Sequence, residues 1–130
     1  MVFLLFSLFL SLFAFAQPAN NNYASATDVS SLINSCSANA AYTTVAATND
    51  NNPGSCWNTT GGSNVWFRFV ATTTQINSQL FTGGAEGSLQ YPYMALWASN
   101  GTTQLGCVTY TSQYSDLDLT LVTSQKIAPD

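Results

Sequence analysis

The chain has 130 residues, the size of a single domain. Only 6% of the residues are charged, with two Lys or Arg against six Asp or Glu and a formal net charge of −4. Two cations cannot build the basic groove that phosphates require, so the composition excludes nucleic acid as a partner and argues against an anionic membrane surface. Hydroxyl and amide side chains must cover most of the surface, which is typical of extracellular β proteins.

Residues 1–16 have the features of a secretory signal peptide. They carry no charge, are rich in Leu and Phe, and end in Ala14-Phe15-Ala16, an A-x-A cleavage pattern. The alternative is a transmembrane anchor, but the apolar run is shorter than the about 20 residues that a span needs. We therefore expect cleavage after Ala16, a secreted or cell-surface protein, and no membrane span after cleavage.

The next residues predict an arm followed by one domain. Residues 17–24 are polar and predict a flexible N-terminal arm, and residues 25–130 form the single predicted domain. Its first part, residues 25–33, has a weak mixed pattern that fits either a short strand or one helical turn. Residues 42–46 are rich in β-branched side chains and predict a strand. Asn- and Gly-rich loops are expected at 48–54 and 58–64.

Residues 65–72 give the clearest strand pattern of the chain. Alternate residues from Val65 to Ala71 form an apolar face, and the opposite face carries Arg68. The remaining strands are expected over residues 75–82, 93–97, 105–108 and 117–122. A hairpin turn is expected at 99–101. Short strands, Gly- and Asn-rich turns and the lack of a long helical pattern predict an all-β fold, an antiparallel two-layer sandwich of jelly-roll type.

Several motifs of the chain together match a known family. The first three cover residues 36–44, 54–58 and 64–69, and the match continues through Tyr93-Met94-Ala95-Leu96-Trp97 and Leu105-Gly106-Cys107. Over about residues 20–122 the chain resembles a repeat-type β-sandwich domain of secreted and surface proteins of Bacteroidetes, which is related to the bacterial pre-peptidase C-terminal domain. The resemblance implies a jelly-roll-like sandwich, often repeated along giant secreted chains that carry adhesion or polymer-binding modules.

The resemblance also implies how the domain ends and how its cysteines pair. The match decays after Val122, so the final strands of the family's domain have no counterpart and the chain is expected to be a truncated domain or fragment. Cys36, Cys56 and Cys107 are disulfide candidates in an exported chain, and their odd number leaves one without a partner. On this basis Cys36 is expected to pair with Cys56, and Cys107 to be unpaired here because its partner would lie in the missing end.

Catalytic chemistry finds little support in the sequence. Gly54-Ser55-Cys56-Trp57 is similar to the segment around the nucleophile of papain-like proteases, but thiol catalysis needs an imidazole and the chain has no histidine. Asp116 and Asp118 would lie on one face of the last strand about 7 Å apart, within the range of an inverting glycosidase. Acids at such a place more often keep a sheet edge solvated. We therefore assign no catalytic residue and expect no enzymatic activity.

Calcium is the metal that the sequence could best accommodate. Asn49, Asp50 and Asn52 offer carboxylate and amide oxygens in one loop, which are ligands that Ca²⁺ accepts. The spacing of an EF-hand is missing, and an ordinary Asn-rich turn is the favoured interpretation. No other cofactor is expected.

Aromatic side chains are the features most compatible with binding. Rings stack on sugars and polymers while amides and hydroxyls around them fix the orientation. The candidate ligand-binding residues, which lie in or beside predicted loops, are Trp57, Tyr91, Tyr93 and Tyr110. Trp66 and Trp97 are assigned instead to the core.

These observations favour an extracellular, non-catalytic β-sandwich module of a cell-surface or adhesin-like protein. Its partner would be an extracellular glycan or a protein surface. The alternative is an accessory carbohydrate-binding domain of a secreted hydrolase, whose catalytic part lies outside this chain.

Overall fold

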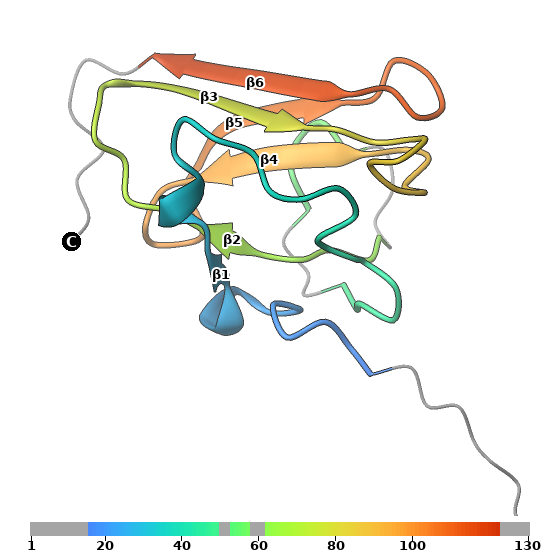
Figure 1. Ribbon diagram of the computed structural model, residues 1–130. Coiled ribbons are helices and arrows are strands. Elements are labelled where there is room, and N and C mark those ends of the chain that lie inside the picture. Colours follow the sequence, from blue (N-terminus) through green and yellow to red (C-terminus); the bar gives the residue numbers. More distant parts are fainter. Residues whose placement is uncertain (1–15, 50–52, 58–61, 123–130) are drawn as a thin grey trace, which may run out of the picture.

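The computed structural model describes residues 16–49, 53–57 and 62–122. Over these residues it consists of six strands and two short 3-10 helices, without an α-helix, which confirms the all-β class (Figure 1). Of the predicted signal peptide, residues 1–15 lie outside the described part. Across the described part, we find no helix that is both long and apolar enough to cross a membrane.

The strands form three two-stranded sheets (Figure 1). β3 (Gln75–Leu80) pairs antiparallel with β6 (Leu117–Val122). β4 (Tyr93–Trp97) pairs antiparallel with β5 (Gln104–Thr109), so the strands predicted near these positions are confirmed.

The third sheet differs from the antiparallel expectation. β1 (Thr27–Asp28) runs parallel to β2 (Phe67–Arg68). The N–H of Thr27 donates to the carbonyl of Trp66 at 3.0 Å, and the N–H of Val29 donates to the carbonyl of Arg68 at 2.8 Å. Parallel strands need a long connection between them, and here almost forty residues of chain, from about 29 to 66, supply it. The two short 3-10 helices, η1 (Tyr23–Ser25) and η2 (Ser30–Leu32), flank β1, so residues 25–33 contain both a short strand and a helical turn.

The two antiparallel sheets pack face to face through the apolar side of β6. Leu117 and Leu119 are 3% and 9% exposed, while the residues between and after them are more open, as the alternation in the sequence predicts. Gly106 of β5 permits the close approach, because a Cβ there would lie only 3.1 Å from Cδ1 of Leu119. This contact fixes the distance between the layers.

Two predicted strands are shorter than expected or absent. Residues 42–46 form no strand, because the hydroxyl of Thr43 accepts the N–H of Val45 and so replaces a ladder bond with a local one. The predicted strand at 65–72 is reduced to Phe67–Arg68. Its facing also differs, since Trp66 is 8% exposed, as its assignment to the core requires, whereas Phe67 is 39% exposed.

The N-terminal arm expected at residues 17–24 is held against the domain. Asn20 and Asn21 are buried at 7% and 5% exposure. The amide of Asn20 donates to the carbonyl of Trp66, and Asn21 exchanges hydrogen bonds with Thr48. The ring of Tyr23 packs edge-on against Trp66 at 5.3 Å. The buried side-chain amides of this polar segment have hydrogen-bond partners in the domain, which explains why the segment is ordered.

The predicted pairing of Cys36 with Cys56 is wrong. Cys56 forms a disulfide with Cys107, 51 residues further along, and Cys36 is a free, exposed cysteine. The physical reason is that Cys107 lies in the middle of β5, directly beneath the loop that carries Cys56, with the two Cα atoms 5.9 Å apart.

We expect Cys107→Ser to lower the free energy of unfolding by about 4 kcal/mol, the chain-entropy value for a loop of this size. Cys36→Ser is the matched control, and its effect should stay within about 0.5 kcal/mol because the side chain is exposed. Urea unfolding under oxidising conditions measures both. Non-reducing peptide mapping should show Cys36 alkylated, and a peptide that links Cys36 to either other cysteine would contradict the assignment.

Candidate functional site

The four aromatic residues predicted to bind a ligand lie together in the structure. The ring centroids of Tyr91 and Tyr110 are 5.1 Å apart, those of Tyr110 and Tyr93 are 5.3 Å apart, and those of Tyr93 and Trp57 are 5.7 Å apart. We call this continuous chain of rings the aromatic row. Tyr91 is its exposed end at 51%, and the other three rings are half-buried.

The β4–β5 hairpin positions the three tyrosines. Tyr93 begins β4 opposite Thr109 of β5, and Tyr110 follows directly after β5. The N–H of Tyr110 donates to the carbonyl of Pro92 at 3.1 Å, which places Tyr110 beside Tyr91 and Tyr93. Pro92 is fully buried and its ring restricts the backbone between the two tyrosines.

The disulfide and a pair of polar bonds position Trp57 at the inner end of the row. Cys56, its neighbour, is bonded to Cys107 of β5. The N–H of Ser55 donates to the side-chain oxygen of Gln104 at 2.7 Å, and the amide nitrogen of Gln104 donates to the hydroxyl of Ser55 at 2.6 Å. The loop is thus attached to β5 at two points, and Trp57 is carried onto Tyr93.

Gly54 makes this packing possible. A Cβ at this position would lie 2.8 Å from Sγ of Cys107, 2.9 Å from Cβ of Ala95 and 2.9 Å from Nε1 of Trp57. That indole nitrogen is buried and has no hydrogen-bond partner among the residues that the structure describes. The loop, the disulfide and β4 therefore meet at a point where only hydrogen fits.

We expect Gly54→Ala to destabilise the domain by about 1–3 kcal/mol, the usual cost of overpacking a tight site. Gly62→Ala is the matched control, because a Cβ at Gly62 would have no atom of the described ranges within 4 Å. Thermal unfolding followed by near-UV circular dichroism measures both, and the near-UV signal of Trp57 should change only in Gly54→Ala. Equal stability of the two variants would contradict this packing.

The aromatic row suits an uncharged ligand. Its four side chains carry rings and phenol or indole groups but no charge, and successive rings are inclined by 59°, 79° and 44°. They therefore do not form one flat platform but offer separate rings. An amide pair lies beside the exposed end, where Gln113 donates to Gln90 at 3.0 Å. Rings with neighbouring amides provide stacking and hydrogen bonding without charge recognition.

The structure describes only one of the three residues of the predicted calcium site. Asn49 is half-buried, while Asp50 and Asn52 lie outside the described residues. Within the ranges that the structure describes, no three His, Cys, Asp or Glu side chains are grouped as a metal site would require. The calcium site stays a prediction.

Asp118 lies in β6 and Asp116 in the loop just before it, and both carboxylates accept hydrogen bonds from neighbouring segments of the chain. A carboxylate oxygen of Asp116 accepts the N–H of Thr82 at 2.9 Å. Asp118 accepts hydrogen bonds from Asn77 at 2.7 Å and from Gln79 at 3.0 Å, both in β3. The bond from Gln79 contributes most to holding the pKa of Asp118 below its ordinary value of 3.8. These carboxylates connect β6 and its preceding loop to β3.

The lowered pKa of Asp118 predicts a specific acid sensitivity. Because the folded state holds this carboxylate ionised, its stabilising contribution is present above the ordinary pKa and is lost as the pH falls through the lower folded value. We expect the unfolding midpoint to decline less in Asp118→Asn than in the wild type as the pH falls below the ordinary pKa of 3.8. Identical profiles for Asp118→Asn and wild type would contradict the role of these bonds.

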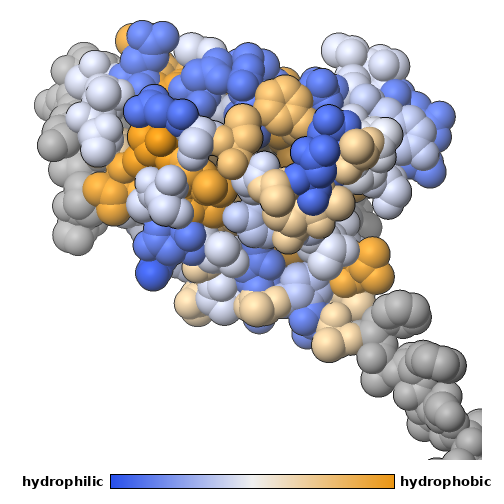
Figure 2. Space-filling model, in the orientation of Figure 1, coloured by the Kyte–Doolittle hydropathy of each residue, from blue (hydrophilic) through white to orange (hydrophobic). Residues whose placement is uncertain are grey.

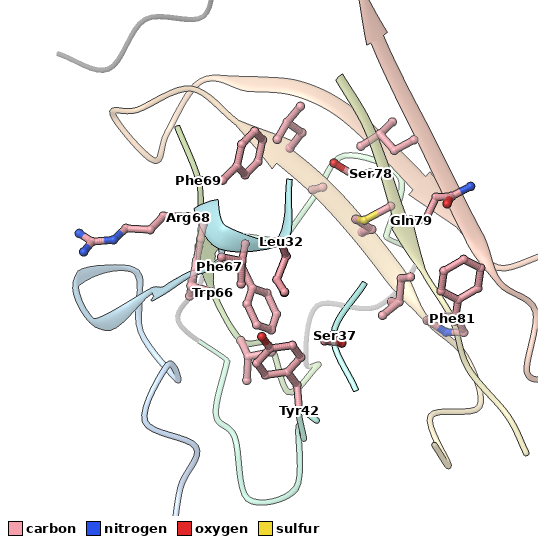
Figure 3. A pocket seen from close by; sticks show the side chains of 18 of the residues that line it. Leu32, Ser37, Tyr42, Trp66, Phe67, Arg68, Phe69, Ser78, Gln79 and Phe81 are labelled. Atoms are coloured by element: carbon pink, nitrogen blue, oxygen red, sulfur yellow. The ribbon is translucent and has the colours of Figure 1, made fainter. Parts of the chain in front are cut away.

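A larger concave region was not predicted from the sequence. A trough of about 2100 Å³ extends over β2, β3 and β4, η2 and the chain from Ile33 to Val45, and its lining also includes Trp57, Tyr91 and Tyr93 of the aromatic row. Figure 3 shows Phe67 and Phe69 on one side of it and Ser78 and Phe81 on the other. The segment 65–72 has apolar residues on both faces, and this pattern could have indicated the trough. A strand with one face in solvent needs apolar residues only on its other face.

In comparisons with known proteins, no family model, no curated protein and no solved structure matches this chain.

Proposed function

We propose that the chain is an extracellular, non-catalytic β-sandwich module of jelly-roll type in a cell-surface or adhesin-like protein. Its aromatic row would contact an uncharged extracellular glycan. The observation that carries the proposal is the convergence of Trp57, Tyr93, Tyr110 and Tyr91 in one row with an exposed end.

The location outside the cell is supported by chemistry. The Cys56–Cys107 disulfide is of the kind that persists in oxidising compartments. The leader-like residues 1–16 and the low content of charged side chains fit the same location. A surface formed by amides and hydroxyls also fits a neutral glycan better than a charged partner.

An accessory carbohydrate-binding domain of a secreted hydrolase is the second candidate. The same aromatic row favours it, because rings flanked by amides suit an insoluble polysaccharide as well as a cell-surface glycan. The two candidates differ in ligand. A glycan array of cell-surface structures tests the first, and pull-down with insoluble cellulose, chitin and xylan tests the second.

We expect Tyr91→Ala to weaken glycan binding about tenfold, which corresponds to about 1.4 kcal/mol. Tyr91 is the most exposed ring of the row, so its removal should alter the ligand contact more than the fold. Titration of the best glycan from the array or pull-down, followed by tryptophan fluorescence, gives the dissociation constants.

Tyr114→Ala is the matched control for that experiment. Tyr114 is similarly exposed at 42%, but its side chain lies over Gly83 rather than in the row. Binding should be retained in this variant. Equal losses in both variants, or no binding of the wild type to any glycan or polysaccharide, would refute the proposal.

A further inference from the structure

The rings of the aromatic row are inclined to one another. The planes of Tyr91 and Tyr110 meet at 59°, those of Tyr110 and Tyr93 at 79°, and those of Tyr93 and Trp57 at 44°. A sugar that stacks on an aromatic side chain lies parallel to the ring beneath it. Sugars that stack on different rings of this row must therefore also be inclined to one another.

Most of the row lies below the surface of the domain. Tyr91 is 51% exposed, whereas Trp57, Tyr93 and Tyr110 are half-buried. Trp57, Tyr91 and Tyr93 also line the trough, so these three rings belong to a concave surface. The extended flat face of a crystalline polysaccharide could touch the exposed end of the row but not its inner rings. A single chain can follow the row inward from Tyr91.

The linkage of a glycan determines whether its sugar planes are inclined. In cellulose and chitin, successive sugars lie nearly in one plane, and the chain is a flat ribbon. In amylose and laminarin, successive sugars turn in the same sense, and the chain coils. The coiled type presents its sugar faces at an angle to one another, as the inclined rings of the row require.

The amide pair beside Tyr91 suits hydroxyl groups. Gln113 donates to the side chain of Gln90 at 3.0 Å, and the N–H of Tyr114 donates to the backbone carbonyl of Gln90 at 2.8 Å, which holds the two segments together. Among the described residues, the side-chain oxygen of Gln113 and the amide nitrogen of Gln90 have no partner, so the pair offers both an acceptor and donors. A sugar hydroxyl can serve both. A polyproline peptide also packs on aromatic rings, but it has no backbone N–H for the acceptor.

The surface around the row favours a neutral ligand. The aromatic row and the amide pair carry no charge, and only 6% of the residues of the chain are charged. Figure 2 shows hydrophobic residues in small groups, with hydrophilic residues between them, on the face drawn there. With so few charges in the sequence, most hydrophilic side chains are amides and hydroxyls, which hydrogen-bond to the hydroxyls of an uncharged sugar.

We propose that the aromatic row binds a single coiled chain of an uncharged glycan, and not the flat ribbons of a crystalline polysaccharide. The inference rests on the proposed function, since it specifies the glycan that the row contacts. One sugar stacks on the exposed ring of Tyr91, with its hydroxyls bonded to Gln90 and Gln113. The following sugars turn inward along the half-buried rings.

The test compares soluble glycans that differ only in their linkage. Cellohexaose, maltohexaose and laminarihexaose are neutral and contain the same number of glucose units, whose C–H faces suit stacking. Isothermal titration calorimetry with the disulfide-bonded chain should show at least tenfold tighter binding of maltohexaose or laminarihexaose than of cellohexaose. Equal or tighter binding of cellohexaose, or binding of none of the three, would overturn the inference.

The length of the glycan shows whether more than one ring is used. A hexasaccharide that follows the row should bind at least tenfold tighter than the disaccharide of the same linkage, because the disaccharide reaches only the exposed end. Equal affinities would mean that the chain does not follow the row, and would overturn the inference. Decaproline is tested alongside, and tighter binding of this peptide than of either coiled hexasaccharide would overturn it as well.

Variants beside Tyr91 locate the bound glycan. Gln113→Ala should weaken binding of the coiled hexasaccharide at least threefold, because it removes the acceptor of the amide pair. Ser112→Ala is the matched control, since Ser112 is the exposed neighbour of Gln113 and lies outside the amide pair. Equal affinities of these two variants would contradict the placement of the first sugar.

The results separate this inference from the proposed function. If cellohexaose and a coiled hexasaccharide bind equally and Tyr91→Ala weakens both, the row binds glycans without selecting their shape, and the inference alone fails. If the chain binds none of these oligosaccharides and nothing on the glycan array or among the insoluble polysaccharides, the proposed function fails with it.

Discussion

The contact of Cys56 and Cys107 beneath Gly54 is the constraint on which the binding surface depends. The disulfide joins the 53–57 loop to the centre of β5, and the missing side chain of Gly54 lets the loop lie directly on Ala95. Without this close approach Trp57 would not reach Tyr93, and the aromatic row would consist of the three tyrosines alone. A covalent bond and a glycine thus define a surface made by residues from three separate parts of the sequence.

The small core explains why a covalent bond is needed. Among the described residues, the buried hydrophobic side chains are few and include two alanines: Ala47, Trp66, Ala71, Leu117 and Leu119. Burial of this extent gives a small hydrophobic contribution to stability, and small domains with weak cores commonly rely on disulfides. The disulfide joins residues that are 51 positions apart and restricts the unfolded chain accordingly. Polar contacts such as those of Asn20 and Asp118 then hold the first described segment to β2 and β6 to β3.

The sequence predicts strands with a clear alternation or a hairpin turn. β4, β5 and the turn at Gly101 follow from turn residues, because a hairpin brings its own neighbour. β6 follows from its alternating leucines, although its partner β3 lies far away in the sequence. Residues 42–46 are rich in β-branched side chains but form no strand, because the hydroxyl of Thr43 accepts the N–H of Val45 in a local bond. The disulfide could not be predicted either, since spacing does not reveal which loop lies over β5. The four aromatic residues were predicted one by one, but their arrangement in a row follows only from the hairpin and the disulfide.

β4 contributes to both the aromatic row and the trough. Its successive side chains point to opposite faces of the strand. Tyr93 and Ala95 face the loop that holds Trp57, as their contacts with Trp57 and with the space at Gly54 show. Leu96 lies opposite Gly106, which packs on Leu119, so this side faces the β3–β6 layer and the trough. The register shift after Leu96 then ends the regular ladder, and Trp97 lies 6.2 Å from Trp66 in the core. One five-residue strand therefore supplies Tyr93 to the aromatic row on one face and Leu96 toward the β3–β6 layer on the other, and all five of its residues line the trough. Packing changes on either face act on the same backbone, which is fixed in place by the disulfide through β5.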